Sequence, residues 1–216
     1  SNINAKIINF MAKYGRGLIC LAMDSTQAKR LNLSLMSANN QSRNKTAFAV
    51  SIEAKKGITT GISARDRART IKIASKKNVN KKDIVSPGHV FPIIAKDGGV
   101  LVRAGHTEAS VDISKIAKKN NSAVICEIMN EDGTMARRDD LIAFAKTHKL
   151  KIGTIADLIH YRTLKEKTVE KLYSKTITID GMNFKLKAWK DSIFQNLHLT
   201  FEVGNIKKSE SYRIFT

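Results

Sequence analysis

Helix-like and strand-like segments alternate along most of the chain, and this alternation constrains the fold more than any other feature. The first helical pattern places Ile3, Ile7, Ile8 and Met11 at helical spacing, and a short apolar run at 18–23 follows it. The same succession of patterns recurs as far as about Tyr161. A chain that alternates in this way is expected to build a layered domain, in which helices cover a sheet.

The individual elements follow from these patterns. Strands are expected at 18–23, 47–53, 90–95, 100–103 and 123–128. Helices are expected at 3–11, 25–31, 63–74, 108–119, 139–146 and 155–161. The Asp97-Gly98-Gly99 turn predicts a hairpin between the third and fourth strands. Asp66, three residues after Ser63, predicts a capping box at the start of the third helix.

The pattern changes after Arg162. Residues 163–174 are charged and predict an exposed helical linker. Short strand-like runs without intervening helices follow, at 176–179, 184–189, 197–203 and 212–215. The chain is therefore divided into a first domain at 1–162, the linker, and a β-rich segment at 175–216. That last segment is small for an independent hydrophobic core.

Composition restricts the class of protein. A hydrophobic content of 42% fits a globular protein, and no apolar stretch is long enough to cross a bilayer. The first residues lack the apolar core of a signal peptide, so a cytoplasmic location is expected. Cys20 and Cys126 are the only cysteines. Two cysteines are too few for a thiolate zinc site, and we expect free thiols.

The formal net charge of +19 will attract anions. Such a charge can mark nucleic-acid binding. However, the basic residues are mostly lysines spread along the chain, without interleaved aromatic residues or a known nucleic-acid motif. We therefore interpret the charge as a solvated lysine-rich surface, or as a field that attracts an anionic metabolite. A nucleic-acid partner is not favoured.

Three loop-like segments carry the candidate chemistry: Pro87-Gly88-His89, Arg103-Ala104-Gly105-His106-Thr107, and Cys126-Glu127. The second segment offers a guanidinium, a glycine and a hydroxyl just before a helical pattern, which is what a phosphate needs. Glu127 leaves the end of a buried strand, where ligand sites often lie. These features predict a small phosphorylated substrate and acid–base chemistry. Taken alone, a loop histidine such as His89 is more often structural than catalytic, and Cys20 is most simply a small buried hydrophobic residue.

Longer motifs extend these segments, and they run in the order 15–20, 57–67, 87–92, 98–109 and 126–137. Together they resemble 3,4-dihydroxy-2-butanone 4-phosphate synthase over residues 3–162. The resemblance implies an α+β fold of YrdC type, with a mixed sheet layered with helices, and a homodimer. It also implies a lyase of riboflavin biosynthesis that uses Mg²⁺ or Mn²⁺. Its substrate would be D-ribulose 5-phosphate, and its products 3,4-dihydroxy-2-butanone 4-phosphate and formate.

The same resemblance implies roles for individual residues. His106 would be a metal ligand, and His89 and Glu127 would transfer protons. The substrate would contact Arg103, Ala104, Gly105, His106, Thr107 and Glu127. The remaining pocket residues would be Cys20, Thr60, Asp66 and Arg67.

Two departures from the family pattern qualify these expectations. The family carries an acidic segment near its start, and residues 1–14 do not resemble it. Residues 1–216 alone are therefore expected to be weakly active or inactive. The tail resembles the opening strands of GTP cyclohydrolase II but lacks its cysteine zinc cluster, so cyclohydrolase activity is not expected.

Two alternatives to an active synthase remain open. The first is a catalytically silent subunit or scaffold of the same family. The second is an RNA-binding protein of the related YrdC-type fold, which only the positive charge favours. Activity with D-ribulose 5-phosphate distinguishes the synthase from the silent subunit, and salt-sensitive RNA binding tests the second alternative.

Overall fold

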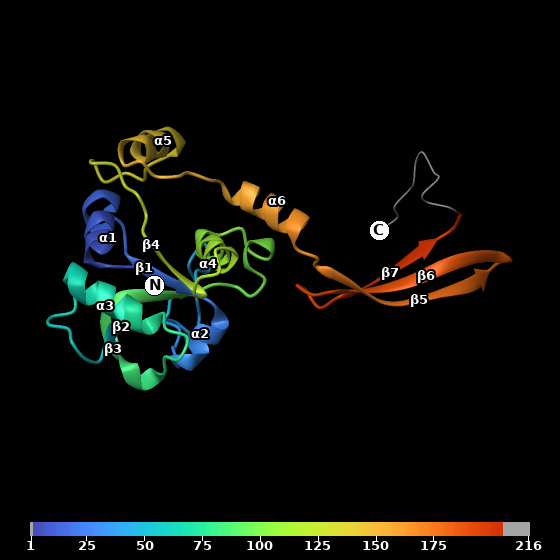
Figure 1. Ribbon diagram of the computed structural model, residues 1–216, viewed down its shortest axis with the longest axis horizontal. Coiled ribbons are helices and arrows are strands. Elements are labelled where there is room, and N and C mark those ends of the chain that lie inside the picture. Colours follow the sequence, from blue (N-terminus) through green and yellow to red (C-terminus); the bar gives the residue numbers. More distant parts are fainter. Residues whose placement is uncertain (1, 205–216) are drawn as a thin grey trace. The chain divides into compact units, whose positions relative to one another are not determined.

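The computed structural model describes residues 2–204 and divides the chain into two compact units, at 1–159 and 160–216 (Figure 1). The first unit contains a four-stranded sheet and most of the helices, and the second contains a three-stranded sheet. The strand expected at 212–215 lies outside the described residues. Within residues 2–204, no helix combines the length and hydrophobicity needed to cross a membrane.

The sheet of the first unit is mixed, as expected. Its strands are β1 (Cys20–Met23), β2 (Ile52–Ala54), β3 (Ile84–Ile94) and β4 (Ser122–Ile125), in the spatial order β2-β3-β1-β4. β1 runs parallel to β3, whereas β2 pairs with β3 and β4 pairs with β1 in antiparallel fashion. Helices and mixed strands in one unit confirm the α+β class.

Helices cover both faces of this sheet (Figure 1). The α-helices that the structure describes are α1 (Ala5–Phe10), which continues as a π-helical turn at Met11–Gly15, then α2 (Ser25–Arg30), α3 (Ala64–Ala74), α4 (His106–Ile116), α5 (Arg138–Thr147) and α6 (Ile155–Lys165). Short 3₁₀ turns occur at Lys81–Asp83 and Gly99–Leu101. α3 packs on α1, β2 and β3, while α4 packs on β1 and β4.

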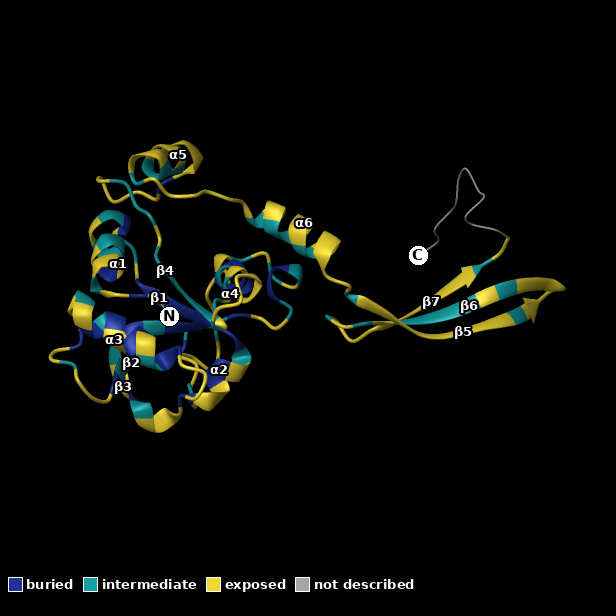
Figure 2. Ribbon diagram, in the orientation of Figure 1, coloured by how far each residue is buried: buried dark blue, intermediate teal, exposed yellow. Residues whose placement is uncertain are grey.

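The alternating side chains of β1 divide the core between the two faces. Leu21 and Met23 belong to the large hydrophobic cluster under α1 and α3. Ala22 points the other way and packs with Val111 of α4 and with Ile125 of β4. Figure 2 shows β1 as buried along its length. Directly paired residues of neighbouring strands share a face, so this division extends to β3 and β4.

The hairpin expected around Asp97-Gly98-Gly99 is wrong. Gly98 and Gly99 have positive φ angles of 88° and 64°, and the chain turns into the 3₁₀ turn instead of a strand. The backbone N–H of Val100 donates to Asp112 Oδ2 of α4 at 2.8 Å. This contact from a distant helix replaces the strand pairing that the local sequence suggested.

The helix expected over residues 163–174 is also wrong beyond Lys165. α6 ends there, and β5 (Val169–Ile179) occupies most of the segment. β5 pairs along its length with β6 (Met182–Asp191), which in turn pairs with β7 (Leu197–Glu202). Pairing with β6 satisfies the backbone of β5 and overrides the local helical pattern.

The second unit is an antiparallel sheet in the order β5-β6-β7, as its strand-like runs predicted. The β5–β6 turn at Asp180 and Gly181 has positive φ angles of 50° and 76°. Among residues 160–204 none is buried (Figure 2). This agrees with the expectation that the segment lacks a core of its own.

Candidate functional site

The face of the sheet that α4 covers carries acid–base side chains at one end. Cys20 of β1 pairs with Phe91 in β3 and with Ile125 in β4. Pairing in this register ends at Cys20; His89 lies two residues before Phe91 in β3, and Glu127 lies two residues after Ile125. Because side chains alternate along a strand, His89 points to the same face as Phe91 and Cys20. Glu127 lies close enough to Cys20 to help raise its pKa. We call Cys20, Glu53, His89 and Glu127 the sheet-end cluster.

Glu53 enters this cluster from the bulged strand β2, which pairs with β3. The carboxylate of Glu53 contacts Nδ1 of His89 directly. The Glu53 side chain is 14% exposed, whereas the His89 side chain is 44% exposed. A Cβ at Gly61 would overlap the Glu53 carboxylate, so this loop needs glycine there. None of the sequence motifs identified Glu53. Its only indication in the sequence was that it follows the apolar Ile52 in a strand with alternating side chains.

Glu127 is fixed by the backbone that precedes β1. Its Oε2 accepts a hydrogen bond from the N–H of Leu18 at 2.9 Å. A Cβ at Gly17 would lie 2.6 Å from the same oxygen, so glycine permits this close approach. The carboxylate is therefore held at the end of the sheet.

Cys20 is only 1% exposed, so its side chain does not line an open surface. It is the small buried residue that the sequence also allowed. Burial, assisted by the nearby Glu127 carboxylate, raises the pKa of Cys20 to about 12. Burial also raises the pKa of Cys126. Both cysteines are free thiols, as expected, and neither is activated as a nucleophile.

Asp66 is buried and organises the loop that carries Thr60. Its Oδ2 accepts from Thr59 Oγ1 at 2.7 Å and from the N–H groups of Thr59 and Gly61 at 3.1 Å each. These hydrogen bonds, above all that from the Thr59 hydroxyl, lower the pKa of Asp66. The Asp66 N–H donates to Ser63 Oγ, which forms half of the predicted capping box. The Asp66 side chain supports the loop instead of completing the box.

Replacing Asp66 with Asn is expected to destabilise the protein most at neutral pH. The unfolded pKa is about 3.9, and the folded pKa lies lower. The ionised carboxylate therefore contributes to the free energy of unfolding above about pH 4. This contribution disappears as the pH falls through the folded pKa of Asp66. Thermal melting of the parent and of Asp66→Asn between about pH 7 and pH 3 should show a difference in Tm that becomes smaller as the pH falls. A difference that stays constant would contradict this role, and Asp139→Asn on the exposed start of α5 is the control.

Arg67 lies on the second turn of α3, close enough to Cys126 to influence its pKa. Among the described residues, Arg67 Nε is buried without a hydrogen-bond partner in the protein. A guanidinium N–H that is buried and unpaired is costly, and a bound anion would satisfy it.

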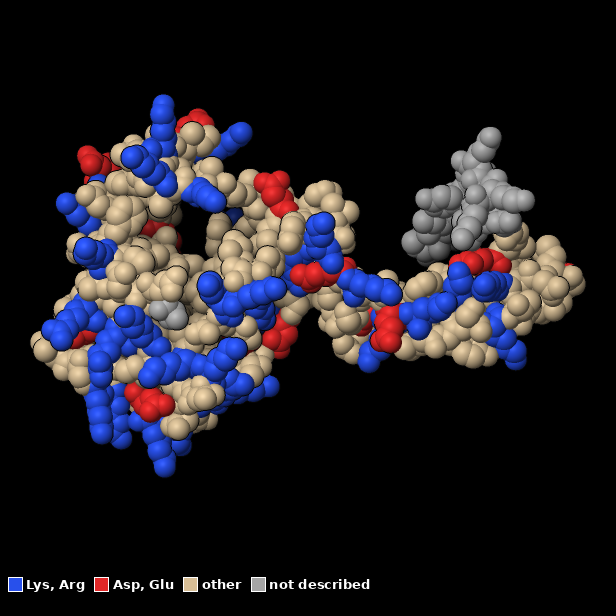
Figure 3. Space-filling model, viewed as in Figure 1, with Lys and Arg blue, Asp and Glu red and all other residues tan. Residues whose placement is uncertain are grey.

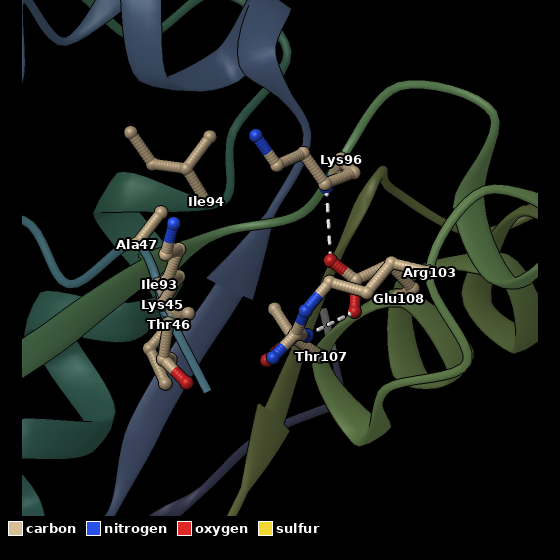
Figure 4. Close-up of a pocket in the computed structure, with 9 residues that line it drawn as sticks. All are labelled: Lys45, Thr46, Ala47, Ile93, Ile94, Lys96, Arg103, Thr107 and Glu108. Carbon is tan, nitrogen blue, oxygen red and sulfur yellow. Dashed lines mark hydrogen bonds and ion pairs between the residues drawn. The ribbon is translucent and has the colours of Figure 1, made fainter. Parts of the chain in front are cut away.

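The second group of predicted residues surrounds the start of α4. Gly105 is the N-cap and offers no side chain, and His106 is the first helical residue and is exposed. Arg103 Nη1 donates to Glu108 Oε2 at 2.6 Å (Figure 4). Arg103 Nη2 donates to the Asn44 carbonyl at 3.2 Å. Glu108 is 1% exposed, although the helical pattern at 108–119 indicated only that it begins a helix.

A small pocket opens beside this ion pair (Figure 4). The pocket is lined by Lys45, Thr46, Ala47, Ile93, Ile94, Lys96, Arg103, Thr107 and Glu108. The N–H of Lys96 donates to Glu108 Oε1 at 3.0 Å, so both carboxylate oxygens of Glu108 are engaged. Arg103 and Glu108 neutralise each other, so the net positive charge of the lining comes from Lys45 and Lys96. This net charge favours an anion.

The pocket and the sheet-end cluster belong to the same face of the sheet. Ile93 lines the pocket and lies four residues after His89 in β3, so both side chains point to the face that α4 covers. β3 thus carries His89 on the same face as the pocket, and Glu127 lies near Cys20 of β1. Within residues 2–204, it does not bring together three His, Cys, Asp or Glu side chains in an arrangement that would hold a metal ion.

Lysines that are distant in the sequence gather over α2 and α3 (Figure 3). Arg30 Nη1 donates to the Lys77 carbonyl at 2.7 Å, and the Lys55 N–H donates to the Asp83 carbonyl at 3.0 Å. We call the exposed set the basic face; it comprises Lys29, Arg30, Lys55, Lys56, Lys72, Lys76, Lys77, Lys81 and Lys82. The charge is therefore more concentrated in space than along the sequence.

Comparison with known proteins places these motifs in a family. A family model for 3,4-dihydroxy-2-butanone 4-phosphate synthase matches residues 1–161. A protein of that name from Pseudomonas aeruginosa is 50% identical over 208 residues, which are 96% of this chain and 57% of the relative. The chain thus spans a little over half the length of this curated relative.

Solved structures agree. RibBX, a two-domain 3,4-dihydroxy-2-butanone 4-phosphate synthase from A. baumannii, is 46% identical with a TM-score of 0.86, over 96% of this chain and 61% of that one. A synthase of the same name in complex with two magnesium ions is 35% identical with a TM-score of 0.72, over 76% of this chain and 82% of that one.

Proposed function

Because the chain belongs to the 3,4-dihydroxy-2-butanone 4-phosphate synthase family, we propose that it converts D-ribulose 5-phosphate into 3,4-dihydroxy-2-butanone 4-phosphate and formate in riboflavin biosynthesis. The observation that supports the proposal is that His89 shares a sheet face with Cys20 and with the pocket at the start of α4, while Glu127 lies beside Cys20. The atoms of the two products sum to those of the substrate. The reaction therefore needs no oxidant and no second substrate.

Proton transfer is assigned to Glu127 and His89. Enolisation requires a base that removes a proton beside a carbonyl, and a later step returns a proton to carbon or oxygen. Glu127 is held by the Leu18 N–H through Oε2, which leaves Oε1 for the substrate. His89 engages Glu53 through Nδ1, which leaves Nε2 for the same purpose. Two groups of different chemistry at one end of the sheet can act at different carbons of a five-carbon sugar.

Phosphate binding is assigned to the pocket at the start of α4. Arg103, Lys45 and Lys96 supply positive charge, and the uncapped first turn of α4 supplies backbone N–H groups. Thr107, which lines the pocket, and the neighbouring Ala104, Gly105 and His106 are assigned to the same phosphate site. Arg67, whose Nε lacks a protein partner, and Thr60 are assigned to the opposite side of the substrate.

A divalent metal, Mg²⁺ or Mn²⁺, is part of the proposal because the magnesium-bound synthase is a relative of this chain. His106 is the residue proposed to bind it. When bound, such an ion stabilises the oxygens of an enediolate. The described residues do not complete a site for this ion by themselves, since Mg²⁺ prefers oxygen ligands and Glu108 is engaged by Arg103 and Lys96. The roles of Glu127, His89 and Arg103 are therefore derived without it.

The proposal also covers assembly and domain division. We propose a cytoplasmic homodimer, and α4 exposes Ile113 at 57% and Ile116 at 40%, which an intersubunit contact would cover. The division into a synthase domain at 1–162 and a second, β-rich part from about residue 175 stays a prediction. The two-domain relative from A. baumannii supports it.

Formate release tests the proposal. When residues 1–216 are expressed within their full reading frame, D-ribulose 5-phosphate and Mg²⁺ should give equal amounts of formate and the four-carbon phosphate. Proton NMR of the reaction detects both products. Addition of EDTA should stop the reaction, and readdition of Mg²⁺ should restore it. Failure to release formate under these conditions would contradict the synthase assignment and favour the silent-subunit alternative.

The basic face gives a second candidate function, which is binding to RNA through phosphate contacts. We expect any such binding to weaken steeply between about 50 and 200 mM salt. Replacing Lys76, Lys77, Lys81 and Lys82 with Gln should abolish a gel shift, while Lys165→Gln with Lys167→Gln, outside this face, should not. A shift that survives loss of the four lysines would rule this surface out.

A further inference from the structure

The partner of His89 suggests how this ring performs its task. Glu53 touches Nδ1 of His89 across the β2–β3 pair, and it is the less exposed of the two side chains. We propose that Glu53 is a positioning residue, which holds His89 in the tautomer that carries its proton on Nδ1 and presents Nε2 to the substrate. This inference rests on the proposed function for the identity of the substrate, but not for the state of the ring.

The tautomer follows from the chemistry of the pair. An ionised carboxylate only accepts hydrogen bonds, so the ring nitrogen beside it must carry a proton. A neutral imidazole has one N–H, and therefore Nε2 is left with its lone pair. A base with that lone pair fixed in direction can take a proton from carbon or from a hydroxyl. Carboxylates that orient histidines in this way commonly change activity 10–100-fold.

The surroundings of Glu53 hold the carboxylate in place. Ile52 pairs with Val90 in β3, and a bulge follows between Ile52 and Glu53, which redirects the next side chain towards His89. Gly61 lies so close that no side chain fits there. Asp66 fixes Gly61 through its backbone N–H at 3.1 Å. Two acidic residues thus form consecutive supports, in which the buried Asp66 holds the loop and the loop confines Glu53.

The pair also has a charge role during proton transfer. When His89 accepts a proton, the ring becomes a cation, and the Glu53 carboxylate already lies beside it. No solvent needs to reorganise around the new charge. Other titratable or charged groups at this end of the sheet include Cys20 of β1, Cys126 and Glu127 after β4, and Asp66 and Arg67 of α3. Asp66 is occupied by its loop, and Cys20 stays a neutral thiol.

Nitrogen-15 NMR of the intact protein tests the tautomer directly. The five histidine rings are separated in long-range proton–nitrogen spectra at alkaline pH, and His89→Gln identifies the signal of His89. We expect a pyrrole-type Nδ1 and a pyridine-type Nε2. Wild-type His89 with its proton on Nε2 would overturn the proposal, whatever the activity of the protein.

Variants of Glu53 test the consequence. Glu53→Met keeps an unbranched side chain without an acceptor, and it should remove the Nδ1–H preference. In the Glu53→Met variant, kcat for formate release should fall about 10–100-fold, while KM should change less than about threefold. Glu53→Asp should restore part of the Nδ1–H preference and part of kcat. Glu170→Met on exposed β5 is the matched control. If the His89 tautomer and kcat are both unchanged in Glu53→Met, Glu53 does not position His89.

Failure of this inference is distinguishable from failure of the proposed function. If the parent protein releases no formate but His89 shows the expected tautomer, which Glu53→Met abolishes, the pairing stands and the assigned reaction is wrong. If formate is released but His89 carries its proton on Nε2, the reaction stands and the positioning role is wrong. If Glu53→Met does not fold, the wild-type spectrum alone decides.

Discussion

Replacing Glu127 with Gln is expected to lower kcat for formate release by about 10²–10⁴-fold, which is the usual contribution of a positioned acid or base. The amide has the size of the carboxylate, and its oxygen can still accept the Leu18 N–H that now binds Oε2. The fold around Gly17 should therefore be retained. Only the ability to take up and return a proton is removed.

The measurement is steady-state formate release, together with thermal melting to show that the variant is folded. Glu131→Gln is the matched control, because Glu131 lies four residues away and its side chain is 93% exposed. The control should keep its activity. Gly17→Ala should also lose activity, since a Cβ there would displace the Glu127 carboxylate. If Glu127→Gln turns over like the control, another group must be the base.

The order of elements in the first unit was predictable because it is written in local patterns. The apolar run before Asp24 and the helical spacing in 63–74 specify a strand and a helix without help from distant residues. The 3₁₀ turn at Gly99–Leu101 was not predictable in this way. Two glycines with positive φ suit a hairpin as well as a 3₁₀ turn, and the contact that decides is made by Asp112 of α4.

In the second unit, too, a local sequence pattern failed to predict the structure, here over most of a strand. The charged segment after Arg162 has a helical pattern, and Arg162 pairs with Glu166 in the i, i+4 manner of a helix. From Val169 onward the chain nevertheless forms β5, because β6 offers a complete set of backbone partners. Local propensity is a weak guide wherever a partner strand is available.

In the candidate site, motifs identified the residues that leave the ends of strands but not their partners. His89 follows Gly88, and Glu127 follows Cys126 at the end of a strand-like run, and both lie in recognisable motifs. Glu53 and Glu108 looked like ordinary strand and helix residues, and only the fold brings them to His89 and Arg103. The hydrogen bonds of Asp66 show that it supports the loop around Thr60, and its predicted contact with the substrate stays a prediction. Pairing between distant segments is set by strand register, which local spacing does not reveal.

The buried ion pair beside the pocket predicts the largest effect on stability. Replacing Glu108 with Ala should lower the free energy of unfolding by about 3 kcal/mol, near the lower end for breaking a buried pair because Arg103 is 30% exposed. The variant leaves the Arg103 guanidinium without its closest acceptor, at 2.6 Å in the parent. It also leaves the Lys96 N–H without the Glu108 oxygen that it binds.

Urea unfolding of four proteins measures this effect and separates its causes. They are the parent, Glu108→Ala, Arg103→Ala and the double variant, whose cost should be less than the sum of the two single variants because they share one interaction. Glu131→Ala is the matched control, since Glu131 pairs with Arg16 on the surface and its loss should cost less than about 1 kcal/mol. The start of α4 is anchored through Glu108, so the same loss should also weaken binding of inorganic phosphate at the pocket. A Glu108→Ala variant as stable as Glu131→Ala would mean that the pair does not hold the start of α4. Residues other than Glu108 would then have to hold the pocket that is proposed to bind phosphate.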